Sequence, residues 1–368
     1  MRILIVSPKN KTVFNFRGDL IRDMISHGHD VFVTGPNMDY VEDILALGVK
    51  EFIPVSLVKD NTSVTGDLAY LRKLRQVMKE KKPDLVFGYT IKPVIYGSIA
   101  AGSTGVPNIY AMVTGLGRVY ASSGIKARAV RMVTKLLYKT AFRFCDKVIF
   151  QNCDDIDELV SDRYLHRSKT VLVNGSGVNM ARFARTALPQ QPVFLMVSRV
   201  IREKGVMEYC QAARAVRQLY PQARFILLGG FDKSIGALKP EDIQPYIEDG
   251  SIEFPGEVKD PVAFYHTASV FVLPSYYREG LPRTLLEAMS CGRAIVTTDW
   301  PGCRVPVEDG VNGFMVPVRD AESLTDRLSR LAADPSLRER MGNAAYESCK
   351  ARFEVEIINA QMRDVLCY

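Results

Sequence analysis

The chain has 368 residues, with 47% hydrophobic residues, 24% charged residues and a net charge of +7. This length allows two domains of ordinary size, and the composition is that of a soluble globular protein. No apolar run reaches the roughly 18 residues of a membrane-spanning helix, and the first residues are typical of a β-strand rather than a signal peptide. We therefore expect a cytoplasmic α/β protein, with reduced thiols because its seven cysteines include no C-x-x-C pair.

The first half alternates strand and helix patterns, which indicates a doubly wound α/β domain with a parallel sheet. Apolar strands are predicted at residues 3–6, 31–34, 52–54, 85–88, 109–112, 147–150 and 171–173. Helices are predicted at 15–27, 40–47, 68–82 and 124–144. The loop after the first strand contains Gly18 alone, without a G-x-G-x-x-G pattern, which argues against NAD or FAD binding. Arg17 lies at the predicted start of the next helix, where it either meets a diphosphate or stays solvated.

Residues 85–145 contain no acidic residue and are rich in lysine and arginine. Within this segment the helix 124–144 is amphipathic, with its cations largely away from the apolar face. The cations that would lie on a membrane face are Lys126, Arg128, Arg131, Lys135, Lys139 and Arg143. Such a helix is typical of an element on an anionic membrane surface, and the alternative is a core helix with a solvated basic face. No nucleic-acid motif accompanies these cations, so nucleic acid is not an expected partner.

Two further features of the first half follow predicted strands. Thr114 and Gly115 belong to a glycine-rich turn after strand 109–112, at the sheet edge where ligands bind in open α/β folds. Asp155 and Asp157 match the D-x-D pattern of some metal sites, but they open a helix, where acidic residues complement the helix dipole. Because the four histidines also lack metal-ligand spacing, we expect no metal and no cofactor.

A second domain begins after residues 184–192, which have the composition of a linker. Its strands are predicted at 193–197, 225–228, 253–254, 270–273 and 295–297. The predicted domains are 1–184 and 185–350, followed by a C-terminal helix at 351–368. Arg199 and Lys204 follow the first of these strands, and they either clamp a diphosphate or lie solvated on the surface.

The stretch 275–292 contains two carboxylates, Glu279 and Glu287, whose spacing suits a ligand. Pro282 fits the first position of a helix whose N-terminus can bind an anion, and Gly280 allows the backbone to approach it closely. Glu287, more than one turn into that helix, would reach neutral hydroxyls such as those of a ribose. The alternative is an ordinary amphipathic helix with both glutamates solvated.

This stretch resembles the glutamate-x7-glutamate signature of the retaining nucleotide-sugar glycosyltransferases of family 4, and Ser198-Arg199-x4-Lys204-Gly205 matches the same family. The resemblance covers nearly the whole chain and is specific in the second half. It implies the GT-B fold, in which two doubly wound Rossmann-like domains face each other across a cleft. The nucleotide would lie on the second domain and the acceptor on the first, and a last helix from about residue 345 would return across the first domain.

The resemblance also implies roles for the charged residues of the second domain. Arg199 and Lys204 would bind the donor phosphates, Glu279 would contact the donor sugar, and Glu287 would hold the ribose. No side chain is an obvious covalent nucleophile. The resemblance therefore implies displacement on one face of the sugar, with the leaving diphosphate helping to deprotonate the acceptor hydroxyl.

Backbone groups complete the implied donor site. The N–H groups of Gly280 and Leu281 would face the donor, and the backbone near Gly230 and Val258 would hold the base. Residues 310–317 resemble the closing hairpin of the family.

The chain departs from many family 4 enzymes because it lacks a Gly-Gly pair near Gly18 and a histidine near Thr114. In these details it resembles bacterial enzymes that extend undecaprenyl-diphosphate-linked glycans, including N-acetylgalactosaminyltransferases. The resemblance implies a metal-independent hexosyltransferase that moves an N-acetylhexosamine from a UDP-sugar to a polyprenyl-diphosphate-linked glycan during surface-glycan assembly. Such an enzyme would be peripheral on the inner face of the cell membrane.

Two other functions remain open at this point. A UDP-sugar epimerase of the same fold would be expected to carry catalytic histidines and more carboxylates in its cleft, and this chain is poor in both. A non-catalytic protein that binds a nucleotide sugar would need neither Glu279 nor Lys204, and both are present.

Overall fold

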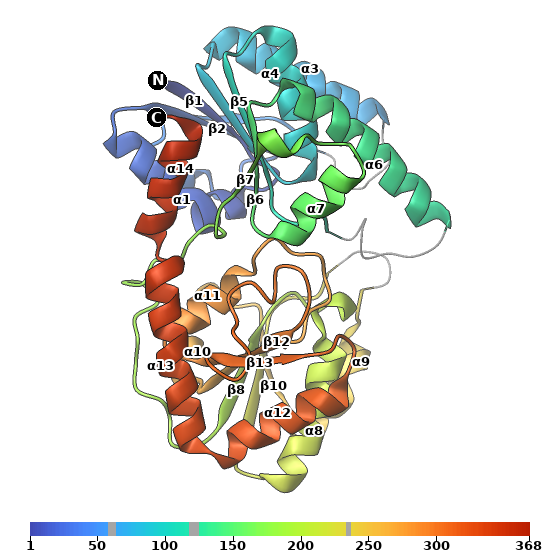
Figure 1. Cartoon of the computed structure of the whole chain (residues 1–368), viewed down its shortest axis with the longest axis vertical. Coiled ribbons are helices and arrows are strands. Elements are labelled where there is room, and N and C mark those ends of the chain that lie inside the picture. The colour runs from blue at the N-terminus through green and yellow to red at the C-terminus, as the bar shows by residue number, and fades with distance from the viewer. Residues whose placement is uncertain (58–63, 118–124, 233–236) are drawn as a thin grey trace. The chain divides into compact units, whose positions relative to one another are not determined.

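The computed structural model of the protein describes residues 1–57, 64–117, 125–232 and 237–368, and at 125–127 it describes the backbone alone. The chain forms two compact units: unit 1 is Met1–Ser176 with Glu356–Tyr368, and unit 2 is Gly177–Val355 (Figure 1). Residues 177–184 and 351–355, predicted for the first domain and the C-terminal tail, therefore belong to unit 2. Within the described part of the chain, no helix has both the length and the hydropathy needed to cross a bilayer.

Unit 1 is built on a seven-stranded sheet with the order β3-β2-β1-β4-β5-β6-β7, in which every pairing is parallel. The strands are β1 (Arg2–Val6), β2 (Asp30–Gly35), β3 (Glu51–Pro54), β4 (Leu85–Tyr89), β5 (Asn108–Val113), β6 (Lys147–Phe150) and β7 (Thr170–Leu172). All seven predicted strands are present. They were predictable because strands covered on both faces are nearly continuous apolar runs.

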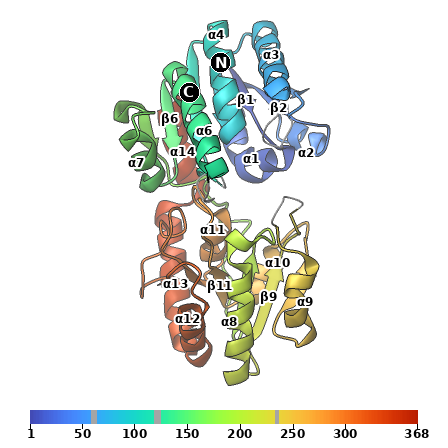
Figure 2. The same ribbon diagram turned by 90° about the vertical axis from the view of Figure 1, so that its right-hand side faces the viewer.

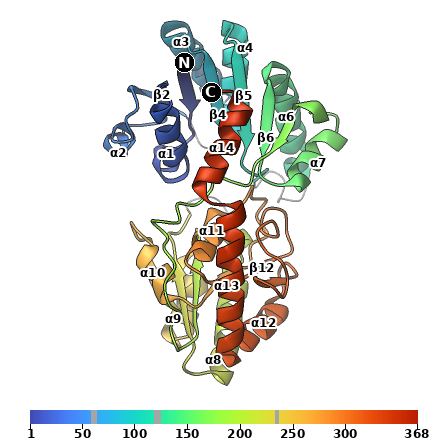
Figure 3. The ribbon, with the colours of Figure 1, turned by 60° about the vertical axis from the view of Figure 1, so that its left-hand side comes forward.

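Helices cover both faces of this sheet. They are α1 (Asn10–Ser26), α2 (Val41–Leu45), α3 (Val64–Lys81), the π-helix η1 (Pro93–Gly97), α4 (Ser98–Thr104), α6 (Ile125–Phe144), α7 (Cys153–Ser161), the 3-10 helix η2 (Arg167–Lys169) and α14 (Val355–Leu366). Ile3 and Ile5 pack with residues of α1 and α14, whereas Leu4 and Val6 pack with residues of α3, α4 and α6. Figure 2 shows α4 beside α6, and Figure 3 shows α14 against the sheet.

Helix α1 begins at Asn10, whereas the sequence predicted a start at residue 15. The Asn10 side chain anchors the first turn, because its Nδ2 donates to the carbonyl oxygens of Asn37 at 2.8 Å and Asp39 at 2.6 Å. Arg17 therefore lies in the interior of the helix, and its predicted place at a helix start is wrong.

The C-terminal end of the chain packs on unit 1 through α14. Residue 345 lies within a longer helix of unit 2, so the predicted start of the returning helix is wrong. Ile358, Met362 and Leu366 of α14 are buried in the core that contains α1. Arg363 forms an ion pair with Asp23 of α1, which also accepts a hydrogen bond from Tyr368 Oη at 2.9 Å.

Unit 2 contains a six-stranded parallel sheet with the order β10-β9-β8-β11-β12-β13. The strands are β8 (Val193–Val197), β9 (Arg224–Leu228), β10 (Glu253–Gly256), β11 (Val270–Leu273), β12 (Ala294–Thr298) and β13 (Gly313–Val316). The helices are the 3-10 helix η3 (Arg202–Lys204), α8 (Val206–Leu219), α9 (Pro240–Glu248), α10 (Val262–Thr267), α11 (Arg283–Ser290), α12 (Ala321–Ala333) and α13 (Pro335–Arg352). All five predicted strands are present.

The sixth strand, β13, corrects the hairpin predicted at 310–317. It pairs in parallel with β12 from Gly313 to Val316 and extends the sheet at one edge. Phe314 and Val316 are buried in the core of unit 2. Because β13 pairs in parallel with β12, this segment is an edge strand of the sheet and not a hairpin.

Helix α13 supports the part of unit 2 that contains α11, because it packs against both α11 and β12. The backbone of α13 closely approaches the turn between α11 and β12 at Gly342, where an added Cβ would lie 2.3 Å from the carbonyl oxygen of Gly292. Any side chain at position 342 must therefore push α13 away from its neighbours.

We expect Gly342→Ala to lower the free energy of unfolding by about 1–3 kcal/mol, as overpacking does in a close-packed core. Urea denaturation measures this loss. Gly97→Ala is the matched control, because a Cβ there would be 3.7 Å from the nearest atoms of Val6, an ordinary contact. Equal unfolding free energies for wild type and Gly342→Ala would contradict the close approach.

Candidate functional site

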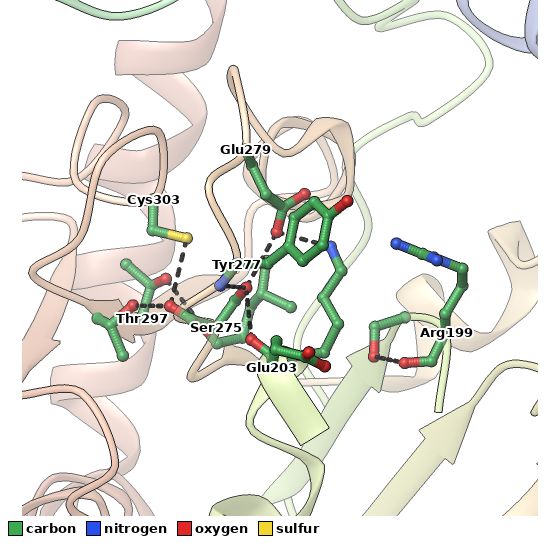
Figure 4. Close-up of polar contacts among 11 residues, drawn as sticks. Arg199, Glu203, Ser275, Tyr277, Glu279, Thr297 and Cys303 are labelled. Carbon is green, nitrogen blue, oxygen red and sulfur yellow. Dashed lines mark hydrogen bonds and ion pairs between the residues drawn. The ribbon is translucent and has the colours of Figure 1, made fainter. Parts of the chain in front are cut away.

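The carboxyl ends of β8 and β11 bring together the charged residues that the sequence analysis singled out in unit 2. These strands are neighbours in the sheet. Arg199 and Lys204 follow β8, and Ser275, Tyr277 and Glu279 follow β11 (Figure 4). Since parallel strands end at the same edge, the two loops lie next to each other.

Gly205 sets how closely the two loops approach. Its φ is +77°, and an added Cβ would lie 2.1 Å from the carbonyl oxygen of Pro274. Only glycine allows both the left-handed backbone and this contact. With the loops this close, Lys204 Nζ lies 2.6 Å from Glu279 Oε1, and the two side chains are 12% and 15% exposed. The structure therefore pairs a predicted phosphate-binding cation with the predicted catalytic carboxylate.

Ser275, which the sequence analysis did not single out, fixes the loop that carries Glu279. Its Oγ lies 3.1 Å from Glu279 Oε1 and 3.3 Å from the carbonyl oxygen of Glu203, and it accepts from the N–H of Tyr277 at 3.2 Å (Figure 4). Its carbonyl oxygen accepts from Thr298 Oγ1. A small polar residue two positions after a buried apolar strand was the available signal.

The loop after β12 packs closely against the Glu279–Gly280 turn. Gly302 has a φ of +82°, and an added Cβ would lie 2.5 Å from the carbonyl oxygen of Glu279 and 2.6 Å from that of Gly280. Next to it, the thiol of Cys303 donates to the carbonyl oxygen of Ser275 at 3.8 Å. Burial raises the pKa of Cys303 to about 12, so this thiol stays neutral and is a poor nucleophile.

Arg199 forms an ion pair with Asp232, with 2.7 Å between Nη1 and Oδ2. Asp232 follows β9 after two glycines, and the sequence analysis assigned it no role. The carbonyl oxygen of Gly230 accepts from the N–H of Val200 at 2.9 Å, and an added Cβ at Gly230 would lie 2.9 Å from Glu257 Oε2. Gly230 therefore lies beside the loop that contains Val258, which is half-buried against the core.

Glu287 lies inside unit 2, and the alternative with both glutamates solvated is wrong. It is 9% exposed, accepts from Tyr265 Oη at 2.9 Å, and lies 3.3 Å from Arg283 Nε. Burial raises the pKa of Glu287, although Arg283 and the Tyr265 hydrogen bond act in the opposite direction. Pro282 precedes the first helical residue of α11 and is its N-cap, one position before the predicted one. Leu281 and Gly280 are both buried in the turn.

The residues predicted for acceptor binding belong to unit 1. Arg17 is only 4% exposed. Its Nη2 donates to the sulfur of Met112 at 2.8 Å, and its guanidinium lies 5.0 Å from the ring centre of Tyr89. Arg17 is therefore buried at the ends of β4 and β5, and the alternative of a solvated cation is wrong. Thr114 and Gly115 follow β5 and are half-buried.

Helix α6 divides its cations between two environments. Lys135 lies 3.4 Å from Glu158 and also pairs with Asp162, so its predicted place on a membrane face is wrong. Arg128, Lys139 and Arg143 are exposed, and Arg131 is half-buried. The side chain of Lys126 lies outside the described residues.

The apolar residues of α6 divide in the same way. Tyr138 and Phe142 are buried against the rest of unit 1, with their rings stacked at 5.0 Å. Met132, Val133 and Leu136 are 59%, 57% and 53% exposed, respectively. The exposed face of α6 therefore carries large apolar side chains together with cations.

The D-x-D carboxylates have separate protein partners. Asp155 is buried: its Oδ2 accepts from Asn152 Nδ2 at 3.2 Å, and its N–H donates to Asn152 Oδ1 at 2.8 Å, which caps α7. Asp157 forms an ion pair with Arg167. Among the described residues, no group of three or more His, Cys, Asp or Glu side chains is placed to hold a metal ion.

Comparison with known proteins gives the same picture for both units. Residues 180–348 match the family model for glycosyl transferases group 1, and residues 2–152 match the model for glycosyl transferase 4-like proteins. The chain is 29% identical to the N,N'-diacetylbacillosaminyl-diphospho-undecaprenol alpha-1,3-N-acetylgalactosaminyltransferase of Campylobacter jejuni, over 95% of this chain and 94% of that one. It is 27% identical to the UDP-Gal:alpha-D-GlcNAc-diphosphoundecaprenol alpha-1,3-galactosyltransferase of Escherichia coli, over 83% and 79% of the two chains.

Solved structures share the fold of the whole chain. Anabaena HepE in complex with UDP-glucose has a TM-score of 0.81 and 20% identity, over 100% of this chain and 99% of that one. The sucrose-phosphate synthase of Thermosynechococcus elongatus has a TM-score of 0.81 and 20% identity, over 99% and 98%. The two parallel-sheet units are thus the Rossmann-like domains of the GT-B fold, as predicted. The chain belongs to the glycosyltransferases, with a 4-like domain in unit 1 and a group 1 domain in unit 2.

Proposed function

We propose that the protein is a retaining glycosyltransferase that moves an N-acetylhexosamine from a UDP-sugar to a polyprenyl-diphosphate-linked glycan in surface-polysaccharide assembly. The observation that carries this proposal is the Lys204–Glu279 pair at 2.6 Å, with Arg199 on the same sheet edge. The acceptor class follows from two relatives whose names give undecaprenyl-diphosphate-linked acceptors. UDP as the donor nucleotide is supported by the name of the second relative and by the UDP-glucose complex of HepE.

In the proposed reaction, the acceptor hydroxyl attacks the anomeric carbon on the face from which the diphosphate departs. A bond forms between the hydroxyl oxygen and the anomeric carbon, and the bond between that carbon and the phosphate oxygen breaks. The hydroxyl proton moves to the departing phosphate oxygen, which takes the electron pair. Arg199 and Lys204 stabilise the charge on the diphosphate, which is where preorganised cations accelerate such a step most.

The two cations also support a reaction without a metal ion. A metal would supply positive charge beside the departing diphosphate, and Arg199 and Lys204 supply it from the chain itself. Glu279 is the carboxylate of the β11 loop that would contact the sugar, and the thiol of Cys303 in the loop after β12 stays neutral.

The direct test is transfer from a panel of UDP- and GDP-sugars, in the presence of EDTA, to a short polyprenyl-diphosphate-linked sugar. Transfer from one UDP-sugar with EDTA present is the expected result. Conversion of a UDP-sugar without acceptor would instead support an epimerase, and binding of a UDP-sugar with no turnover would support a non-catalytic protein.

Glu279→Gln should lower kcat for transfer about 10²–10³-fold, the usual effect of removing one preorganised electrostatic contact. The affinity for UDP should not fall, because the glutamine leaves Arg199 and Lys204 in place and removes the carboxylate that competes with the diphosphate for Lys204. Turnover assays and calorimetric titration with UDP measure the two effects. Unchanged turnover would contradict a catalytic role for Glu279.

Glu287→Gln should weaken the binding of uridine and of UDP by the same factor, about tenfold, because both ligands contain the ribose. Calorimetric titration with each ligand measures this. A loss confined to UDP would contradict the ribose role and would place Glu287 near the phosphates.

We also expect the stability of Glu287→Gln relative to wild type to change with pH. Because burial raises the pKa of Glu287 above 4.5, folding favours its protonated form. The stability that the protonated Glu287 carboxyl contributes is complete below pH 4.5 and is lost as the pH rises through the raised pKa. The melting temperature of Glu287→Gln relative to wild type should therefore increase with pH over this window, and a constant difference would contradict the buried, titrating carboxyl.

We also propose that the exposed face of α6 rests on the anionic inner surface of the cell membrane, where a polyprenyl-linked acceptor is held. Met132, Val133 and Leu136 would enter the headgroup region, with Arg128, Lys139 and Arg143 beside them. Apolar contact and basic side chains together give the reversible binding of an interfacial helix. Electrostatic attraction contributes about 1 kcal/mol per cation near such a surface.

The triple variant Arg128→Gln, Lys139→Gln, Arg143→Gln should bind phosphatidylglycerol vesicles about 100-fold more weakly than wild type, from three such contributions. A flotation assay measures binding. The matched control is Arg72→Gln, Lys73→Gln, Lys79→Gln, which removes three exposed cations from α3. Equal losses in the two variants would show that net charge, and not the α6 face, attracts the membrane.

A further inference from the structure

Tyr277 lies against both of the cations at the carboxyl edge of the unit 2 sheet. The guanidinium of Arg199 is 5.5 Å from the centre of its ring, and Lys204 Nζ is 5.8 Å from the same point. Both distances are within the range of a cation–π contact. One aromatic ring from the loop after β11 therefore contacts two cations from the loop after β8.

The backbone of Tyr277 is held in place by the loop that carries Glu279. Its N–H donates to Ser275 Oγ at 3.2 Å, and its carbonyl oxygen accepts from the N–H of Glu279 at 2.8 Å (Figure 4). Ser275 is itself fully buried. The ring is thus attached to a fixed part of the fold, whereas Arg199 and Lys204 reach it on long side chains.

Two cations placed side by side repel each other, and each long side chain loses rotamer freedom when it is ordered. The negative face of an aromatic ring attracts both cations without neutralising either one. Asp232 and Glu279 each pair with one of the two cations and would compete with a diphosphate for it, whereas the uncharged ring would not. A ring therefore suits a site that must hold two cations ready for an anionic ligand.

We propose that Tyr277 is a positioning residue that holds Arg199 and Lys204 at the spacing of the two donor phosphates. The ring is the part that contacts both cations, and the phenol oxygen also interacts with Arg199. This inference rests on the proposed function, because it takes Arg199 and Lys204 to bind the donor diphosphate. It adds a residue to that site and a basis for preferring a diphosphate over a monophosphate.

The test compares Tyr277→Leu with Tyr277→Phe by calorimetric titration with UDP, UMP and uridine. Tyr277→Leu removes the ring and should weaken UDP binding about tenfold, the size expected from losing two cation–π contacts. UMP should be affected less than UDP, and uridine should bind as it does to wild type. Tyr277→Phe keeps the ring and removes only the hydroxyl beside Arg199, so its UDP affinity should stay closer to wild type than that of Tyr277→Leu, with uridine binding unchanged.

Phe314→Leu is the matched control for loss of a ring. Phe314 also lies under two arginines of unit 2, Arg327 at 5.0 Å and Arg330 at 4.9 Å, on a different part of the domain. This variant should lower the melting temperature without changing the ratio of the UDP and uridine affinities.

The outcomes separate this inference from the proposed function. If wild type binds none of the three ligands, the UDP-dependent function fails. If wild type binds UDP and Tyr277→Leu binds UDP as tightly as wild type does, the positioning role of Tyr277 is overturned. An equal loss for uridine and UDP would also overturn it, because it would show a general structural effect.

Discussion

The ion pair between Lys204 and Glu279 is the interaction on which the unit 2 site depends. It forms because Gly205 lets the loop after β8 touch the carbonyl of Pro274, which begins the loop after β11. Both side chains are mostly removed from water, and burying a charged pair costs solvation that its attraction often fails to offset. Net stability is therefore a poor explanation for this pair. The pair lies at the carboxyl ends of two adjacent parallel strands, where ligands bind in open α/β sheets. This position indicates a role in ligand binding.

The same geometry has a consequence for how a diphosphate would bind. Each of the two cations already has a carboxylate partner, since Arg199 pairs with Asp232 and Lys204 with Glu279. A diphosphate that takes both cations must compete with two carboxylates, and it then leaves Glu279 able to hydrogen-bond to the sugar. Binding of the diphosphate and release of the proposed catalytic carboxylate are thus coupled by charge. The Tyr277 ring differs from these partners because it attracts both cations and carries no charge that competes for them.

The fold was predictable from the sequence because its strands are buried on both faces and are nearly continuous apolar runs. Helix starts were less predictable, and α1 shows why. Its first turn is anchored by contacts of Asn10 with Asn37 and Asp39, which are distant in the sequence. Within the site, Glu279 and Lys204 were found from a family pattern. Ser275 and Asp232 were missed because their importance comes from contacts between different loops.

Arg17 and Lys135 show the same limit for charged residues. Both were predicted on binding surfaces from their position and charge alone. Arg17 is buried on the ring of Tyr89, and Lys135 pairs with acidic residues of the neighbouring α7. A periodic pattern shows which residues share a helix face, but the partners of that face belong to other elements. Only the tertiary structure shows which partners a cation has.

Helix α6 illustrates how the fold selects a surface from an amphipathic pattern. The rings of Tyr138 and Phe142 fix the helix on unit 1, and Lys135 fixes it to α7. These contacts orient the helix so that Met132, Val133 and Leu136 remain exposed beside Arg128, Lys139 and Arg143. A helix held only by its core residues could rotate to bury more of its apolar surface. The Lys135 ion pairs oppose that rotation, so a cation wrongly predicted to touch the membrane instead helps to hold the exposed face outward.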